Sequence, residues 1–248
     1  MRHTKIEGIV NPDGTPGYSW NPFVGCLNGC SYCWARKCLA RSKCELCRKF
    51  TPHWHAERMG QPYALKKPST IAVCWMGDVW KYWDAADGDL TAGTLRAMMA
   101  NLKKHTFLCL TREPIYYRDY WKRLFTDNVW LGVTVTNQED VDRIGPDFAA
   151  VDHPNKFVSY EPMLGEIRDW GKLGRFGWLY MGALTDGRGR NVPLKIENCK
   201  FQIVKWTTQG LVAARERGAK VWAKKNLDAF EFGREGDQWA KETPWLKV

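Results

Sequence analysis

The chain has no apolar run approaching the roughly 18 consecutive apolar residues that a membrane-spanning helix requires. Its first residues, Met-Arg-His-Thr-Lys-Ile-Glu, contain no apolar segment of the kind that directs secretion. The sequence also contains no internal repeat and no low-complexity linker. These absences exclude an integral membrane protein, and they predict a cytoplasmic protein that makes no membrane contact.

Composition narrows the class further. Nine cysteines without an export signal indicate reduced thiols and metal ligands, because a disulfide framework needs an oxidising compartment. A net charge of +10 suggests a polyanionic partner, although the basic residues are spread along the chain and a merely solvated basic surface stays possible. Fourteen tryptophans can pack between sheet and helices or stack on bases, and composition does not separate these uses.

Short apolar runs alternate with stretches of helical period. We predict a first strand near Tyr18–Val24, five further buried strands and a weaker last one: Ile71–Met76, Thr106–Leu110, Val129–Val135, Lys156–Tyr160, Trp178–Met181 and Lys220–Ala223. Amphipathic helices are predicted at Leu90–Lys103, Ile115–Phe125, Gln138–Ile144 and Phe201–Arg217. Asp87 or Asp89 is suited to cap the first of these helices, and Gly218 to end the last.

Alternating strands and helices imply parallel strand pairing with right-handed crossovers. A closed barrel of eight units typically needs about 250 residues, so 248 residues with extra terminal segments fit six units better. We therefore predict a single α/β domain, a partial (β/α)6 TIM-like barrel with an N-terminal arm. Its core would span about residues 18–225, followed by a C-terminal extension over 226–248. A doubly wound open sheet is the alternative.

Cys26, Cys30 and Cys33 lie within the eight-residue run Cys-Leu-Asn-Gly-Cys-Ser-Tyr-Cys. Thiolates are the usual ligands of iron–sulfur clusters, and a four-iron cluster takes four of them. Three protein ligands would leave one iron open for chemistry. Zinc sites instead favour a tetrahedral set built from pairs spaced two to four apart. The alternative is that the three cysteines are buried as small apolar residues.

Polar or glycine residues follow each apolar run, and in parallel α/β proteins the working groups lie at the carboxyl ends of strands. The residues in these positions are Gly77 and Asp78, Thr111 and Arg112, Thr134, Thr136 and Asn137, Ser159 and Glu161, and Gly182. They predict one cofactor site at the mouth of the barrel. The competing explanation is that strand ends become polar wherever they meet water.

The three-cysteine run resembles the signature of the radical S-adenosylmethionine (SAM) superfamily. Five further segments resemble a phage-associated radical SAM family of unknown function: Trp20–Pro22, Cys33–Arg36, Pro52–Arg58, Asn128–Val133 and Val158–Pro162. The resemblance covers nearly the whole chain. It implies the partial barrel of the radical SAM type, and for a phage protein the cytoplasm of a bacterial host.

The resemblance also implies the cofactors. A [4Fe–4S] cluster on Cys26, Cys30 and Cys33 would cleave SAM to methionine and a 5′-deoxyadenosyl radical, with electrons from a donor such as flavodoxin or ferredoxin. The residues that match the SAM site are Tyr32, Gly77, Asp78, Thr111, Arg112, Thr134, Thr136, Asn137, Ser159 and Glu161. Within this set, Met-Gly-Asp stands where the superfamily has Gly-Gly-Glu, with one glycine fewer and a shorter acid. A guanidinium such as that of Arg112 suits a bidentate contact with the SAM carboxylate.

A second cysteine group follows the first. Cys38, Cys44 and Cys47, together with His53 or His55, could form a closed zinc site of mixed sulfur and nitrogen ligands. The alternative is a set of reduced, unligated thiols. The remaining cysteines, Cys74, Cys109 and Cys199, are predicted to lie in the core.

The basic charge and the many aromatic residues favour a base in DNA or RNA, or a nucleotide, as the substrate. Trp75, Trp80 and Trp83 could stack on that base or simply pack, and Lys81 and Arg112 could meet backbone phosphates. A radical SAM enzyme acting on a small molecule or a peptide is the first alternative. The second is a non-catalytic nucleic-acid-binding protein whose cysteines hold a structural metal.

Overall fold

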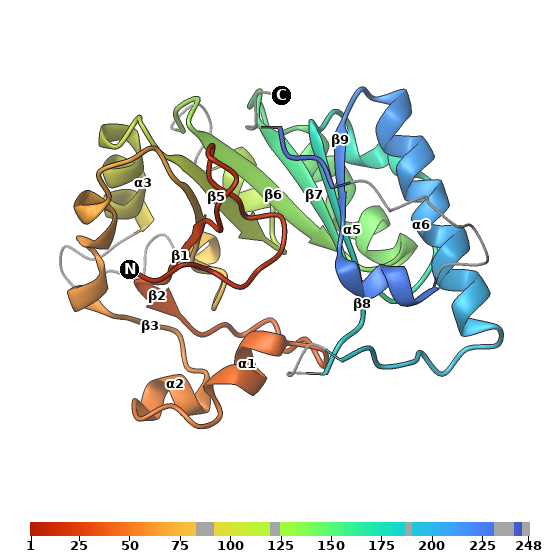
Figure 1. Cartoon of the computed structure of the whole chain (residues 1–248), viewed down its shortest axis with the longest axis horizontal. Coiled ribbons are helices and arrows are strands. Elements are labelled where there is room, and N and C mark those ends of the chain that lie inside the picture. The colour runs from red at the N-terminus through yellow and green to blue at the C-terminus, as the bar shows by residue number, and fades with distance from the viewer. Residues whose placement is uncertain (83–91, 120–124, 187–189, 231–240, 245–248) are drawn as a thin grey trace.

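The computed structural model describes residues 1–82, 92–119, 125–186, 190–230 and 241–244. A parallel sheet of seven strands dominates this part of the chain, in the order β1-β4-β5-β6-β7-β8-β9. The strands are β1 Tyr18–Trp20, β4 Thr70–Val73, β5 Thr106–Thr111, β6 Val129–Val135, β7 Lys156–Met163, β8 Trp178–Ala183 and β9 Lys220–Ala223. Spatial order follows chain order, so the sheet curls in one direction into a half-barrel (Figure 1). A doubly wound sheet reverses its order at a switch point, so that alternative is wrong.

Helices cover the outer face of the curled sheet. The α-helices of the described residues are α1 Trp34–Leu39, α2 Glu45–Lys49, α3 Ala92–Asn101, α4 Ile115–Asp119, α5 Gln138–Ala149 and α6 Cys199–Glu216. Leu95 of α3, Val141 of α5 and Ile203 of α6 are buried in one apolar core against the sheet. None of the described helices is long and apolar enough to cross a membrane.

The two faces of the sheet follow from the alternation of side chains along a strand. Leu179 and Met181 of β8 point into the core beneath the helices. Trp178 and Tyr180 of the same strand point to the concave face, where they join a second apolar cluster that includes Ile9. The concave face is therefore packed with aromatic side chains at its base, and the N-terminal arm covers that base.

The N-terminal arm, residues 1–17, also spans from the first strand to the last. The amide of Thr4 donates to Gly17 O beside β1. At the other side of the half-barrel, Tyr180 Oη donates to Glu7 O at 2.7 Å, and the amide of Lys225 donates to Glu7 Oε2 at 2.7 Å. The arm thus connects the two edges of a sheet that its strands alone do not close.

The predicted first strand, Tyr18–Val24, is wrong in its extent. β1 ends at Trp20, and Phe23–Val24 form a separate strand, β2, which pairs antiparallel with β3, His53–Trp54. Pro22 explains the break, because proline has no N–H to continue a strand ladder. The amide side chain of Asn21 is used locally, with Oδ1 accepting from the amide of Met76 at 3.1 Å.

Most other predicted elements are present, but β4 ends at Val73, three residues before the predicted end at Met76, where the chain turns. The predicted weak last strand is present as β9, which pairs with β8. With it the sheet has seven strands, one more than the six strands of a (β/α)6 barrel. Helix α5 runs past the predicted end at Ile144 to Ala149, because the amide of Ala150 still bonds to Pro146 O at 3.1 Å. Gly218, at φ +65°, ends α6 as expected. Asp87, Asp89 and Trp83 lie outside the described residues.

The described residues of the predicted C-terminal extension, 226–230 and 241–244, pack on the barrel. Leu227, only 1% exposed, contributes to the core beneath the helices. Farther along, the amide of Glu242 donates to Val221 O and Trp178 Nε1 donates to Glu242 O. The extension therefore covers the outer edge of β9.

Candidate functional site

The three-cysteine loop lies between β2 and α1 and contacts the turn after β4. The amide of Gly25 donates to Met76 O at 3.1 Å, and Gly25 and Gly77 form a parallel bridge. A Cβ on Gly77 would lie 2.5 Å from Gly25 O, closer than real Cβ contacts come. Glycine at this position is thus required by the close approach of two backbones, and that approach fixes the loop at the carboxyl end of the sheet.

The three cysteines are half-buried, and the sulfurs of Cys26 and Cys33 accept local hydrogen bonds. Cys26 Sγ accepts from the amide of Asn28 at 3.3 Å. Cys33 caps α1, its Sγ accepting from the amide of Arg36 at 3.4 Å. Cys30 lines a pocket. Burial raises the pKa of the Cys26 thiol to about 11.

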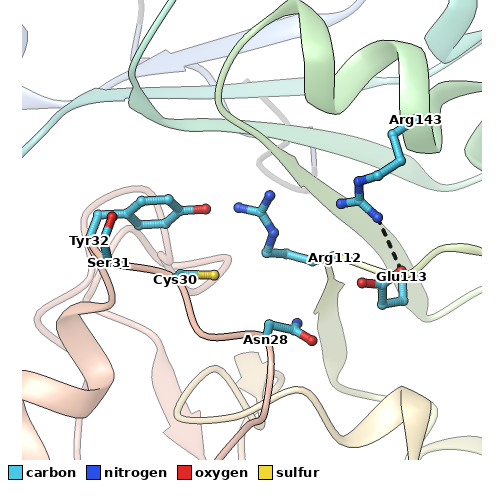
Figure 2. Close-up of a pocket in the computed structure, with 7 residues that line it drawn as sticks. All are labelled: Asn28, Cys30, Ser31, Tyr32, Arg112, Glu113 and Arg143. Carbon is cyan, nitrogen blue, oxygen red and sulfur yellow. Dashed lines mark hydrogen bonds and ion pairs between the residues drawn. The ribbon is translucent and has the colours of Figure 1, made fainter.

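A pocket of about 370 Å³ opens beside Cys30. Its lining residues are Asn28, Cys30, Ser31, Tyr32, Arg112, Glu113 and Arg143. Figure 2 shows the sulfur of Cys30, the hydroxyl of Tyr32 and the guanidinium of Arg112 pointing toward the same space. At the far wall, Arg143 Nη1 pairs with Glu113 Oε2 at 3.3 Å. Of the predicted cofactor residues, the structure brings Tyr32 and Arg112 to this pocket.

The guanidinium of Arg112 is held in place, but not all of its hydrogen-bond donors have a partner among the described residues. Its Nη2 donates to Asp140 Oδ1 at 2.6 Å, and its guanidinium carbon lies 5.7 Å from the centre of the Tyr32 ring. Arg112 Nη1 and Tyr32 Oη are buried, and neither has a hydrogen-bond partner among the described residues. Buried polar groups are normally paired, so these two atoms mark a place suited to a polar ligand.

Asp78 ties the cysteine loop to β5. Its carboxylate accepts from Thr111 Oγ1 at 2.8 Å, from the amide of Arg112 at 3.0 Å and from Asn28 Nδ2 at 3.1 Å. Burial nevertheless raises its pKa to about 6, although these hydrogen bonds pull it down. Lys81 Nζ donates to Asn28 Oδ1 at 2.6 Å. Asp78 and Thr111 therefore support the loop that carries the cysteines, and Lys81 contacts that loop.

Thr136 and Asn137 build the start of α5. Asn137 Oδ1 caps the helix by accepting from the amide of Asp140 at 2.9 Å. Asp140 Oδ2 accepts from both the amide (2.9 Å) and the hydroxyl (2.6 Å) of Thr136. Because Asp140 also binds Arg112, these two predicted residues reach the pocket through that ion pair and are not among its lining residues.

Thr134, Ser159 and Glu161 lie on the concave face, away from the pocket lining. Thr134 and Ser159 are register partners in β6 and β7. Glu161 forms an ion pair with Lys224, whose ammonium lies 5.4 Å from the centre of the Tyr180 ring. A Cβ on Gly182 would lie 3.0 Å from the Glu161 carboxyl group, so glycine leaves room for it. This pair is a second polar centre at the same end of the sheet.

The second cysteine group forms a compact cluster, but without Cys38. The ligand atoms of Cys44, Cys47, His53 and His55 all lie within 4.8 Å of one another. Cys38 is exposed on α1. The chain turns at Phe50, which has φ +56°, and this turn folds β3 back onto α2 so that both histidines meet both cysteines. The set therefore has two histidines, where the prediction had three cysteines and one histidine.

Trp75 and Trp80, near the second strand end, are used in packing. Trp80 is fully buried, with its ring against Phe125, and cannot stack on a base. Trp75 Nε1 donates to Leu108 O at 2.9 Å, and the ring packs against Phe157 on the concave face. Cys74 and Cys109 are buried as predicted, whereas Cys199 is half-buried against the core.

Several residues of the site were not predicted from the sequence: Asn28, Glu113, Asp140, Arg143 and Lys224. Asp140 had a local signal, because an acid three residues after a capping Asn is common at helix starts. Lys224 follows β9, the strand end that the sequence analysis did not use. Asn28 lies inside the cysteine motif itself.

The model of a family described as "Protein of unknown function (DUF5131)" matches residues 16–195. This match covers well over half of the chain, so the chain belongs to that family. No curated protein and no solved structure matches the chain.

Proposed function

We propose that this member of the DUF5131 family is a radical SAM enzyme that modifies a nucleic-acid base or a nucleotide. The carrying observation is the placement of Cys26, Cys30 and Cys33. The loop that contains them lies at the carboxyl ends of a curled parallel sheet, beside a pocket with two buried polar atoms that have no hydrogen-bond partner among the described residues. Parallel α/β folds use this end of the sheet for chemistry.

The donor set fits a [4Fe–4S] cluster with one open iron. Three half-buried cysteines lie in one loop, and no other cysteine of the described residues belongs to that loop. Cys26, Cys30 and Cys33 would hold such a cluster, which when reduced would supply the one electron needed to cleave SAM into methionine and a 5′-deoxyadenosyl radical able to abstract hydrogen from the substrate. The loop's backbone closely approaches Gly77 and its Asn28 side chain donates to Asp78, and both contacts anchor the loop that carries the cysteines.

The pocket beside Cys30 suits the amino-acid end of SAM. A carboxylate there would accept from Arg112 Nη1, the buried donor that lacks a partner among the described residues. A guanidinium pairs strongly with a carboxylate. Asp140 fixes the orientation of Arg112, and Thr136 and Asn137 fix Asp140. In this proposal Arg112 binds SAM. The Arg112 side chain is held in position by Asp140, Thr136 and Asn137.

The concave face beyond the pocket is proposed as the substrate side. Thr134, Ser159 and the Glu161–Lys224 ion pair offer hydrogen-bond donors and acceptors there, above an aromatic floor that includes Tyr180. A nucleobase presents a polar edge and an apolar face, and this combination matches both kinds of surface. The positive net charge favours a phosphate-bearing substrate.

The test is anaerobic reconstitution of the full chain with iron and sulfide. We expect about four irons per chain, visible absorption that bleaches on reduction, and 5′-deoxyadenosine when SAM and a reductant such as flavodoxin or ferredoxin are supplied. Cys30→Ala should lose both the iron and the product, whereas Cys38→Ala, a change at the exposed cysteine, should keep both. An Arg112→Gln variant should bind SAM roughly 10- to 100-fold more weakly, the worth of a charged hydrogen bond.

Three outcomes would contradict the proposal. A reconstituted protein without iron would remove the cluster and favour a nucleic-acid-binding protein with a structural metal. A Cys30→Ala variant with a full cluster would show that the three-cysteine loop does not hold it. SAM cleavage stimulated by a small metabolite or a peptide, with no modified nucleoside after digestion of candidate oligonucleotides, would keep the chemistry and change the substrate class.

A further inference from the structure

We propose that Cys44, Cys47, His53 and His55 bind one zinc ion in a closed structural site. Four of the distances between ligand atoms fit a tetrahedral site, and all four ligand atoms lie within 4.8 Å of one another. Cys47 Sγ lies 3.2 Å from His55 Nε2 and 3.5 Å from His53 Nε2, Cys44 Sγ lies 3.6 Å from His53 Nε2, and the two Nε2 atoms lie 3.0 Å apart. Zn–S bonds of about 2.3 Å and Zn–N bonds of about 2.0 Å in a tetrahedron place S and N about 3.5 Å apart and two N atoms about 3.3 Å apart.

The hydrogen bonds of the two histidines fix which nitrogen faces the metal. His53 Nδ1 lies 2.7 Å from Thr51 O, and His55 Nδ1 lies 3.1 Å from Glu57 Oε1. A carbonyl and a carboxylate oxygen only accept, so each Nδ1 carries a proton and donates it. Each Nε2 then presents a lone pair to the centre of the cluster. Metal-bound histidines are oriented in the same way by a carbonyl or carboxylate behind the ring.

A cluster without a cation would bring two lone pairs together. With both Nδ1 atoms protonated, His53 Nε2 and His55 Nε2 face each other at 3.0 Å with no hydrogen between them. A divalent cation between the nitrogens and two thiolates removes this repulsion. Four protein ligands leave no open position, which is typical of structural and not catalytic zinc.

The proposed zinc site also supports the first cysteine of the cluster loop, an extension that rests on the proposed function. The chain between the cysteine and histidine ligands passes through Phe50 and Thr51. Phe50 O accepts from the amide of Cys26 at 3.4 Å. A Cβ on Gly25 would lie 2.3 Å from Thr51 O. Metal that holds α2 against β3 therefore fixes the backbone on which Cys26 rests.

The first experiment needs no variant. Metal analysis of the full chain, purified in air so that no iron–sulfur cluster is present, should find about one zinc per chain. Exchange with Co²⁺ should give the visible bands of a tetrahedral sulfur–nitrogen site. A chain that contains no zinc, and gives no such spectrum with excess Co²⁺, would overturn the proposal.

Matched variants then assign the ligands. Cys44→Ser places a good capping residue at the start of α2, so the helix should form, yet zinc affinity in a chelator competition should fall at least tenfold. Cys38→Ser makes the same chemical change on an exposed cysteine and should keep the wild-type affinity. Equal affinity in all three proteins would overturn the assignment.

A third comparison separates the zinc site from the cluster. The Cys30→Ala variant, purified in air, should retain its zinc, and loss of zinc would place the metal in the three-cysteine loop instead. Reconstituted Cys44→Ser should hold less iron than reconstituted Cys38→Ser. Equal iron would refute the supporting role and leave the zinc site itself unaffected. A failure of SAM cleavage in the wild-type chain would contradict the proposed function, and it too would leave the zinc site unaffected.

Discussion

Two opposing effects act on the pKa of Asp78, the residue that holds the cysteine loop against β5. Three hydrogen bonds favour its ionised form, and burial disfavours it. Burial prevails and raises the pKa from an ordinary 3.8 to about 6. Between these two values the folded chain binds more protons than the unfolded chain does. The stability that protonated Asp78 contributes is therefore complete below about pH 4 and is lost as pH rises through about 6.

This predicts the effect of Asp78→Asn on the pH dependence of stability. The free energy of unfolding of the wild-type chain should contain a component that falls by about 3 kcal/mol from pH 4 to pH 7, from a shift of about two units. The Asn variant should lack that component, because its amide does not ionise. Urea unfolding at a series of pH values measures both.

Asp13→Asn is the control for the Asp78 variant. Asp13 is exposed, and its pKa is lowered by a hydrogen bond from Thr15, so its contribution to stability has the opposite dependence on pH. If wild-type and Asp78→Asn chains show the same slope from pH 4 to pH 7, the pKa of Asp78 is not raised in the folded chain.

Residues with local signals were predictable, and residues joined by long-range contacts were not. The spacing of Cys26, Cys30 and Cys33 is visible in the sequence, and so is the polar end of each strand. The ion pair of Arg112 with Asp140 joins positions 28 residues apart, and no periodicity in the sequence predicts it. Trp80 could not be assigned from the sequence, because an indole that stacks on bases and one that fills a core have the same sequence signal. In the structure Trp80 is buried.

At the scale of elements, the contact between the cysteine loop and the turn after β4 requires glycine at position 77, because any side chain there would meet the backbone of the loop. Gly77→Ala would place a Cβ 2.5 Å from Gly25 O, a backbone atom that cannot rotate away. We expect a loss of stability of about 1–3 kcal/mol, the usual cost of overpacking. We also expect less iron per chain after reconstitution, because the loop must move.

Gly60→Ala is the matched control, since no atom in the described part of the chain lies within 4 Å of the added Cβ. Urea unfolding and iron analysis of the two variants distinguish the outcomes. Unchanged stability and iron content in Gly77→Ala would show that the close approach of the two backbones does not hold the loop.

Elements with strong periodicity could be predicted, and irregular ones could not. The parallel strands and α6 follow from apolar runs and helical period. The two-residue strands β2 and β3 are too short for a pattern, and they pair across about 30 residues of chain. Their pairing brings His53 and His55 to Cys44 and Cys47, so both the second histidine of the metal cluster and the exclusion of Cys38 depended on an element that the sequence does not reveal.

At the scale of the whole molecule, the net charge of +10 predicts how a nucleic acid would bind. Binding to an oligonucleotide should weaken steeply as salt rises, because each phosphate contact releases a counterion. Single strands should bind more tightly than duplexes, since a site on the concave face cannot reach a stacked base. Fluorescence anisotropy over a salt series, with single- and double-stranded oligonucleotides, measures both effects. Absence of binding at low salt would exclude a polynucleotide substrate.

The N-terminal arm has a consequence for the order in which the molecule takes shape. The hydrogen bond from Lys225 to Glu7 joins residues 218 positions apart, and closing a flexible loop of that length costs about 5 kcal/mol in chain entropy. The four residues of the metal cluster lie within a dozen positions, for which the same expression gives about 2 kcal/mol. On the ribosome, the segment that carries the four proposed zinc ligands is complete before most of the sheet has been synthesised. The arm, although made first, can take its place only after β9 has emerged.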